Sequence, residues 1–185
     1  MNKNRDQSQV TIRLGRMADL IGLSHLVEKA HQESRYRDLP LDPGAFKRDY
    51  MVAMRSPRQQ VWVAEREGEL VGALVAITDK VYGWSTARVA TDIFFYVSEV
   101  GIGSGAGLLR RFMQWAAAFP DVVMVVLQTG SGIREDSRVE RLYEAFGMEI
   151  TGQIYQLWFP GKKPKSHMTN EEQAKHPEST TGETP

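Results

Sequence analysis

The sequence predicts a single-domain α/β protein built on a mixed, mostly antiparallel sheet. Strand-like and helix-like apolar patterns alternate from residue 10 to residue 160, no linker or repeat divides that stretch, and 42% of the chain is hydrophobic. A stretch of about 150 residues suits one hydrophobic core. The ends are nearly free of apolar side chains, so we expect a flexible N-terminus over residues 1–8, a domain over residues 9–160 and a disordered polar tail over residues 161–185.

The first elements are predicted to be one strand and two helices. Residues 10–14 alternate between apolar and polar side chains, which is typical of a strand. Residues 17–30 place apolar side chains at helical spacing on one face. A second helix is expected to begin at Asp42, which suits the N-cap position, with Pro43 as the first helical residue.

Three strands follow and should form an antiparallel meander. Residues 59–65 and 70–78 read as a hairpin whose turn contains Gly68, and residues 89–97 continue the sheet. The strand residues Thr91 and Asp92 are adjacent, so alternation predicts that their side chains point to opposite faces.

The last part of the domain is predicted to alternate helix, strand, helix and hairpin. A helix should begin near Gly107, and the aliphatic run at residues 122–128 predicts a buried strand. A capping box formed by Ser137 and Glu140 opens the final helix, for which Gly147 is the C-terminal stop. Residues 148–159 are expected to close the sheet as a hairpin.

Composition excludes several classes of function. The chain has no cysteine, which removes thiolate nucleophiles, and its four histidines show no spacing that would gather metal ligands. Its formal net charge is zero, so no overall field attracts nucleic acid or an anionic membrane. No apolar run is long enough to span a bilayer. We therefore expect a cytoplasmic protein without a metal, a nucleic-acid partner or a membrane partner.

A glycine-rich turn lies between the third meander strand and the following helix. It reads S-E-V-G-I-G-S-G-A-G, with glycines at 101, 103, 105 and 107. Glycines at a helix start let backbone N–H groups approach an anion, which favours a phosphate site. A P-loop is excluded, because no Gly-Lys-Ser or Gly-Lys-Thr follows. Gly101, Gly103 and Ala106 formally fit the dinucleotide fingerprint, so a nucleotide-dependent oxidoreductase stays open, although the mid-chain position after a meander disfavours it.

Two separated motifs resemble the GNAT family of N-acetyltransferases. That family has a pyrophosphate loop of pattern Q/R-x-x-G-x-G/A, and here residues 100–105 read V-G-I-G-S-G. Its last helix commonly carries an asparagine followed by Leu-Tyr-Glu, and here Asp136 precedes Leu142, Tyr143 and Glu144. The order of the predicted elements is also that of the family. Val100 departs from the usual arginine or glutamine, and Asp136 from the usual asparagine.

The resemblance implies a GNAT fold, with the sheet splayed between its fourth and fifth strands and helices on both faces, and acetyl-CoA as cosubstrate. Matching by motif places the cosubstrate on the fourth strand, the glycine turn and the last helix. The implied binding residues are Tyr96, Val97, Gly101, Ile102, Gly103, Ser104, Gly105, Ala106 and Asp136. Tyr143 matches the family's general acid, which protonates the departing CoA thiolate.

The resemblance also directs attention to the general base and the acceptor. A base is needed because a lysine-like amine is almost fully protonated at neutral pH. Asp92, next to the family's glutamate position, is one candidate, and Glu33, where the first two helices join, is the other. The acceptor is expected to be a small-molecule or protein amine, and a homodimer is one option for assembly. A CoA-binding module with weak catalysis is the alternative that the substitutions at positions 100 and 136 suggest.

Overall fold

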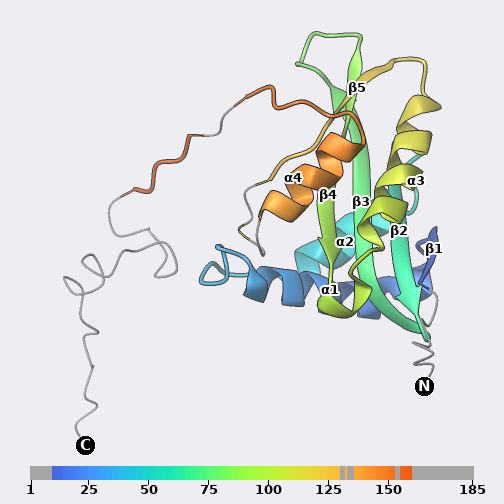
Figure 1. The fold of residues 1–185 in the computed structure, drawn as a ribbon, viewed down its shortest axis with the longest axis vertical. Helices are drawn as coiled ribbons and strands as arrows, with labels where there is room; N and C mark the ends of the chain where they lie inside the picture. Colours follow the sequence, from blue (N-terminus) through green and yellow to red (C-terminus); the bar gives the residue numbers. More distant parts are fainter. Residues whose placement is uncertain (1–9, 130–131, 133–135, 153–154, 160–185) are drawn as a thin grey trace, which may run out of the picture.

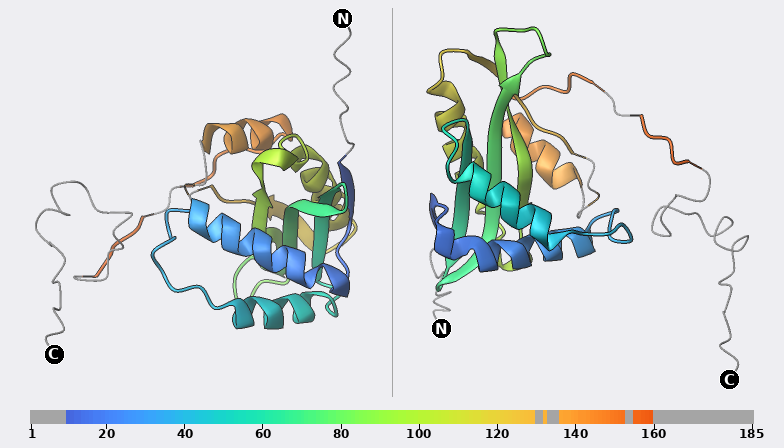
Figure 2. Two further views of the ribbon diagram at one scale, coloured as in Figure 1. Left: turned by 90° about the horizontal axis from the view of Figure 1, so that it is seen from below. Right: turned by 180° about the vertical axis from the view of Figure 1, so that it is seen from behind.

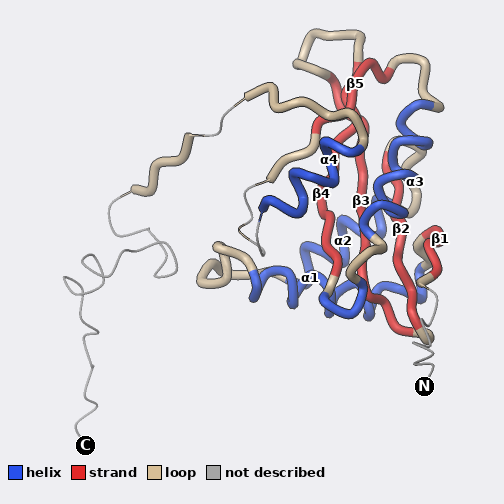
Figure 3. Tube along the Cα trace, in the orientation of Figure 1, coloured by secondary structure: helices blue, strands red, loops and turns tan. Residues whose placement is uncertain are grey.

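The computed structural model describes residues 10–129, 132, 136–152 and 155–159. It contains five strands and four α-helices within those residues (Figures 1 and 3). The predicted flexible N-terminus and polar tail lie outside the described residues. The elements run in the order β1 (Thr11–Leu14), α1 (Leu20–Glu33), α2 (Pro43–Ala53), β2 (Gln59–Arg66), β3 (Glu69–Lys80), β4 (Arg88–Val97), α3 (Gly105–Ala117), β5 (Val122–Val126) and α4 (Asp136–Ala145).

The five strands form one mixed sheet in the order β1-β2-β3-β4-β5. The first four pair antiparallel, and β5 pairs parallel to β4 after the crossover through α3. This confirms the predicted mixed, mostly antiparallel sheet. It excludes a doubly wound parallel sheet, and so removes the fold-level support for a dinucleotide site at the glycine turn.

β4 changes its course at a bulge. Its register with β3 steps from Phe94 opposite Val75 to Asp92 opposite Ala76, so Ile93 is an extra residue in β4. A bulge of this kind bends the strand that carries it. The parallel pairing of β4 with β5 ends at Thr91, immediately before the bulge. Beyond that point β4 pairs with β3 alone, and β5 ends at Val126.

Helices cover both faces of the sheet (Figure 2). α1 and α2 pack on one face, where Leu23 and Tyr50 are buried against β2 and β3. α3 packs on the other face, where Leu108 and Phe112 are fully buried. α4 lies beside α3 on that second face and contributes Leu142, Tyr143 and Phe146, which are partly buried. Burial of these apolar side chains is the main force that holds the helices on the sheet.

The start of β5 is anchored by an ion-pair cluster. Arg58, before β2, donates two hydrogen bonds to the carboxylate of Asp121 at 2.9 Å each. Arg88 at the start of β4 approaches the same carboxylate at 3.4 Å. The backbone N–H of Arg88 also donates a hydrogen bond to the carbonyl oxygen of Asp121 at 2.8 Å. The cluster therefore fixes β4 and β5 together at the end where they still pair.

Two predictions for the last part of the domain are wrong. The strand at residues 122–128 was expected to be buried, but it is shorter and forms the sheet edge, with Val123 63% exposed and Met124 44% exposed. The predicted closing hairpin is absent from the described residues 148–152 and 155–159, which leave the sheet (Figure 1). The physical reason is that no described strand pairs with the outer edge of β5, and Tyr155 and Leu157 stay exposed.

Candidate active site

A wide concavity opens where β4 and β5 part. It is a cavity of about 1010 Å³ lined by Thr91–Val97 of β4, by the ends of α1 and β5, by the glycine turn and by α4. Seven successive residues of β4 line it, because the pairing of β4 with β5 ends at Thr91 and no other described strand continues along that edge. Backbone N–H and C=O groups along such an edge can receive a ligand as if it were another strand. This is the splay that the family resemblance implied.

The glycine turn forms one end of the cavity. A short 3₁₀ helix, Glu99–Gly101, leads from β4 into the turn, and α3 begins at Gly105, two residues earlier than predicted. The first N–H groups of an α-helix have no partner inside the helix. The hydroxyls of Ser98 and Ser104 are buried and have no hydrogen-bond partner within the described residues. Unused donors and the positive end of the α3 dipole together suit a phosphate group.

The glycines of this turn serve different purposes. At Gly101 an added Cβ would lie 2.5 Å from the backbone oxygen of Val71, so this glycine allows the turn to pack against β3. Gly103 has φ +102 and open space around its Cβ position, so it allows the backbone to turn toward the cavity. Gly105 has ordinary contact distances, the nearest being 3.4 Å to Leu142. Only Ile102, Gly103 and Gly105 of the predicted turn residues line the cavity itself.

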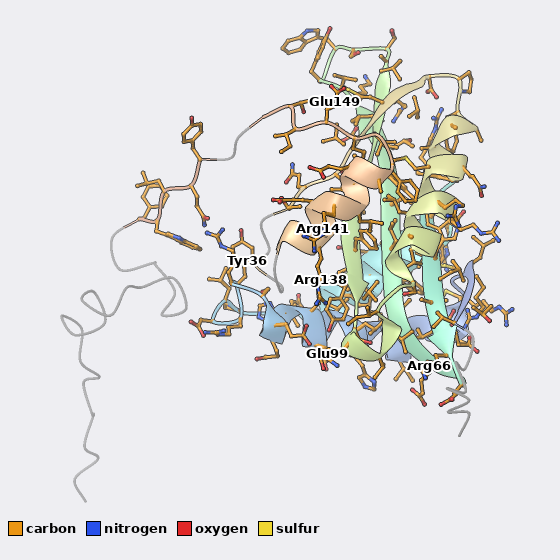
Figure 4. All side chains as sticks on the ribbon, viewed as in Figure 1. Tyr36, Arg66, Glu99, Arg138, Arg141 and Glu149 are labelled. Atoms are coloured by element: carbon orange, nitrogen blue, oxygen red, sulfur yellow. The ribbon has the colours of Figure 1, made fainter. Side chains whose placement is uncertain are left out.

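The positively charged side chain that contacts this turn comes from strand β2 and not from the glycine motif itself. Val100, where the family usually has arginine or glutamine, is 61% exposed and supplies no charge. Arg66 at the end of β2 donates a hydrogen bond through Nη1 to the carbonyl oxygen of Val100 at 3.1 Å. The labelled positions of Arg66 and Glu99 in Figure 4 show this end of the sheet. Arg66 therefore holds the turn and adds a guanidinium near it, which sequence motifs could not reveal.

Asp92 lies on the β4 wall of the cavity. Thr91 and Asp92 both line the cavity, although alternation predicted opposite faces, because the bulge at Ile93 interrupts the alternation. Burial raises the pKa of the Asp92 carboxyl to about 6, since desolvation penalises its charged form and only a local backbone hydrogen bond opposes it. A carboxylate that titrates near neutral pH in a cavity is suited to accept a proton.

Tyr143 lies on the opposite wall, on α4. Its ring packs with the second-face core and its side chain lines the same cavity as Asp92. Burial is the larger cause that raises the pKa of the Tyr143 phenol, and the nearby negative charge of Asp92 raises it further. The phenol is therefore protonated throughout the physiological range. Asp92 and Tyr143 are close enough to influence each other's charge, although 51 residues separate them in the sequence.

Only some of the remaining predicted site residues line the cavity. Tyr96 and Val97 line the cavity from the end of β4, and Tyr96 is also part of the core at 3% exposure. Gly101, Ser104 and Ala106 belong to the turn without lining the cavity. Asp136 is the first residue of α4. Glu33 is the last residue of α1, and it is not among the side chains that line the cavity.

Several lining residues were not predicted as site residues. His31 lines the cavity near the end of α1, and its Nε2 lies 3.0 Å from the carbonyl oxygen of Leu39, so it also shapes the connection from α1 to α2. Arg35, Arg138 and Gln156 line the cavity from three different segments. They are far apart in sequence, and of the three only Arg138 lies within a motif, between Asp136 and Leu142 of the last helix. Within the described residues, no cluster of three or more potential metal ligands occurs.

No helix within the described residues combines the length and the apolar character that crossing a membrane requires. No protein-family model matches the chain, and no curated protein matches it in sequence. The fold, by contrast, is similar to many solved structures.

Several of those structures are acetyltransferases. An aminoglycoside N-acetyltransferase in complex with CoA is 16% identical with a TM-score of 0.64, covering 84% of this chain and 98% of that chain. A predicted acetyltransferase with acetyl-CoA from Clostridium acetobutylicum is 16% identical with a TM-score of 0.63, covering 80% and 96%. Glucosamine-6-phosphate N-acetyltransferase from Arabidopsis thaliana is 15% identical with a TM-score of 0.62, covering 82% and 99%. The chain therefore has the GNAT acetyltransferase fold that its two motifs indicated.

Proposed function

We propose that this protein is an acetyl-CoA-dependent N-acetyltransferase that moves the acetyl group to a primary amine by direct attack in a ternary complex. The observation that supports this most is a single cavity that joins a glycine-rich helix start with Asp92 and Tyr143 at the point where β4 and β5 part. The similarity to acetyltransferase structures, two of them solved with CoA or acetyl-CoA, agrees with it.

The residues present fit the cosubstrate. The pyrophosphate of acetyl-CoA would be held by the backbone N–H groups of the first turn of α3, from Gly105 to Gly107, since those of Ile102 and Ser104 already donate within the glycine turn. Arg66 holds that turn through its hydrogen bond to the carbonyl oxygen of Val100. Beyond Thr91, where pairing with β5 ends, the outer edge of β4 faces the cavity and can offer N–H and C=O groups to the amides of the pantetheine arm. When bound, the cosubstrate supplies the thioester that the amine attacks. Direct transfer suits a chain without cysteine.

Asp92 and Tyr143 divide the proton transfers between them. The carboxylate of Asp92 takes a proton from the acceptor ammonium, which frees the lone pair that forms the new C–N bond. As the C–S bond breaks, Tyr143 donates its phenolic hydrogen to the departing sulfur. Before the next turnover the protonated carboxyl of Asp92 gives up its proton and the Tyr143 phenolate regains one, both by exchange with solvent in the cavity. The nitrogen loses a second proton after it attacks, so two protons leave the ammonium in all: one ends on the thiol of CoA and the other is released to solvent.

Thiol release from acetyl-CoA in the presence of a library of primary amines tests the proposal. We expect release with at least one amine, and a loss of about 10²-fold in kcat in Tyr143→Phe with little change in CoA affinity. Tyr82→Phe, on the exposed connection between β3 and β4, is the matched control and should keep full activity. Stabilisation by CoA without turnover of any amine would instead indicate a CoA-binding module, and stabilisation by NAD but not CoA would overturn the proposal.

A further inference from the structure

The cavity reaches both faces of the sheet. Phe94 and Tyr96 of β4 pack with the core beneath α1 and α2. Phe95 and Val97 of the same strand pack with the core beneath α3 and α4. All four residues line the cavity, which opens at the gap where the pairing of β4 with β5 ends at Thr91. The cavity therefore has an α1 half and an α4 half, and the gap in the sheet joins them.

The groups that the proposed function assigns to the cosubstrate belong to the α4 half. Asp92 is paired with Ala76, which is buried in the core beneath α3, so the two side chains share this face. The negative charge of Asp92 acts on the pKa of Tyr143 across the α4 half. At the start of α3, an added Cβ on Gly105 would lie 3.4 Å from Leu142 of α4. The acetyl group is thus presented from the α4 half, which leaves the α1 half for the acceptor.

The α1 half is lined by α1 and by the connection that leads to α2. Figure 4 marks this end of the cavity by Tyr36. Val27 and His31 come from α1. Ser34, Arg35, Tyr36 and Leu41 come from the connection. An acceptor in this half is therefore recognised by side chains that no motif contains.

Two of the polar side chains in the α1 half hold the connection in shape. The hydroxyl of Ser34, which is 6% exposed, donates to the carbonyl oxygen of His31 at 2.8 Å and accepts from the N–H of Tyr36 at 3.0 Å. The Nε2 of His31 lies 3.0 Å from the carbonyl oxygen of Leu39. Because a carbonyl oxygen only accepts, Nε2 is the donor in this contact. A ligand that competed for these bonds would have to displace a partner within the protein.

The guanidinium of Arg35 is also engaged by the protein. Its Nη2 donates to the amide oxygen Oε1 of Gln156 at 2.9 Å, and its Cζ lies 5.5 Å from the centre of the Tyr36 ring. A guanidinium in such contacts covers an aromatic ring and ties two distant segments together. Arg35 therefore contributes to the wall of the α1 half.

The apolar side chains of the α1 half are the ones left for a ligand to cover. Leu41 is 38% exposed although it lies in the well-bonded connection, and Val27 and Phe94 are half-buried. An exposed apolar side chain on an open surface is ordinary, but these three border one concave site. An apolar ligand that covered them would gain the free energy of removing their surface from water.

We infer, on the basis of the proposed function, that the acceptor is a primary amine that carries an apolar hydrocarbon group, which packs against Val27, Leu41 and Phe94. Its amine reaches through the gap in the sheet to the thioester beside Asp92. Amines whose substituents are hydroxylated or charged are poorer acceptors, because these groups lose hydration in the α1 half without a matching gain. The inference sorts acceptors by hydrophobicity, which neither the fold nor the motifs do.

A graded set of amines tests this inference. Unbranched alkylamines from ethylamine to hexylamine differ in length but hardly in basicity, and kcat/KM should rise about 4-fold for each added methylene that is buried. Butylamine should exceed 3-amino-1-propanol, which has a hydroxyl in place of the last methyl group, by about 10-fold or more. The tripeptides Leu-Gly-Gly and Ser-Gly-Gly form a second arm, which shows whether the apolar group belongs to a small amine or to the first residue of a peptide.

Substitutions at Leu41 locate the effect. Leu41→Ser should lower the preference for butylamine over 3-amino-1-propanol by about 3-fold or more, while the affinity for CoA, measured by thermal shift, stays the same. Leu41→Met keeps an apolar side chain of similar volume and should keep the preference. Ile21→Ser is the matched control, because Ile21 is 71% exposed on α1 and does not line the cavity. Thermal unfolding of each variant shows that it is folded.

The outcomes separate this inference from the proposed function. If no amine is acetylated, both fail. If amines are acetylated but kcat/KM is flat along the alkyl series and the polar amines equal the apolar ones, the acceptor inference fails and the function stands. The acceptor inference also fails if Leu41→Ser weakens CoA binding and leaves the preference unchanged, because the α1 half would then serve the cosubstrate.

Discussion

The cavity has two walls, one formed by β4 and the other by α4. The rest of the molecule holds these two walls in different ways. β4 is paired with β3 along its whole length from Arg88 to Val97, and its Ala90 is fully buried. α4 packs through partly buried side chains, and β5 nearby is an exposed edge. The base candidate lies on the first wall and the acid candidate on the second.

This difference teaches that the two halves of the proposed chemistry depend on different parts of the fold. The position of Asp92 depends on the bulge and on the β3–β4 register, both of which the central sheet fixes. The position of Tyr143 depends on how one amphipathic helix docks. Elements with fewer buried contacts open at lower free energy than the core does. Changes to the first wall should therefore affect stability and chemistry, and changes to the second should affect chemistry more than stability.

The largest expected effect is on catalysis at the β4 wall. Asp92→Asn should lower kcat/KM by about 10²–10⁴-fold, because an amide cannot take the amine proton. The wild-type rate should rise with pH through about 6, as the carboxyl ionises, and this limb should vanish in the variant. Thiol release measured from pH 5 to 9 checks both, with Asp79→Asn at the exposed end of β3 as control. If the rate of Asp92→Asn still rose with pH through about 6, a residue other than Asp92 would be the general base, and Glu33 would be the next candidate.

The same substitution makes a prediction about stability with a definite sign. The folded pKa of Asp92, about 6, lies above the ordinary value of an aspartate. Ionisation in the folded state therefore costs stability, and this cost is absent below pH 4 and develops as pH rises through about 6. Asp92→Asn should be more stable than the wild type at pH 8, by at most about 3 kcal/mol, and equal to it at pH 4. Thermal unfolding at the two pH values measures the difference.

The next prediction compares the loss of stability caused by a substitution in the core with the loss caused by one at the sheet edge. Phe112→Ala removes a fully buried ring of α3 and should destabilise the protein by about 3–5 kcal/mol. Met124→Ala at β5, where the side chain is 44% exposed, should cost less than about 1 kcal/mol. Urea unfolding gives both values. A cost at Met124 comparable to that at Phe112 would show that the outer side of β5 is covered in solution.

Two smaller expected effects distinguish Gly101, which packs against β3, from Gly103, which lines the cavity. Gly101→Ala should cost about 1–3 kcal/mol of stability, because its Cβ would press on the Val71 carbonyl oxygen. Gly103→Asp should instead weaken CoA binding about 10-fold or more, since it places a negative charge beside the phosphates. Gly103→Asn, of nearly the same shape without the charge, is the control for the backbone. Isothermal titration with CoA, together with unfolding curves, distinguishes the two effects.

Much of the structure behind these two walls could be predicted from the sequence. The features that were missed were missed for physical reasons. The central strands, the helices and the glycine turn follow local patterns of apolar spacing and capping, so they were predicted close to their observed bounds. The bulge at Ile93 was missed because it depends on register with β3, which no local pattern encodes. Arg66 and Arg138 were missed for a similar reason, since each acquires its position only when distant segments meet.

The predicted closing hairpin shows how far local pattern can mislead. Tyr155, Leu157 and Phe159 alternate as a strand would, and so do Val61 and Val63 of β2. The β2 residues are buried to 1% and 0% exposure because β1 and β3 hold β2 inside the sheet and α1 and α2 cover this face. Tyr155 and Leu157, by contrast, are 90% and 84% exposed. Alternation makes a strand possible, and a paired neighbour makes it stable.

The smallest expected effect tests this last distinction. The double variant Tyr155→Ala/Leu157→Ala removes two large side chains that are 90% and 84% exposed, so its unfolding free energy should stay within about 0.5 kcal/mol of the wild type. Val61→Ala/Val63→Ala, with the same spacing in β2, should cost several times more, because each valine leaves a cavity in the core. If the first double variant cost more than about 2 kcal/mol, or shifted the oligomeric state measured by light scattering, the 155–159 segment would be packed against a sheet edge in solution. The exposed edge of β5 would then be its natural partner, because Val123 and Met124 there would gain the cover that the segment's apolar side chains can give.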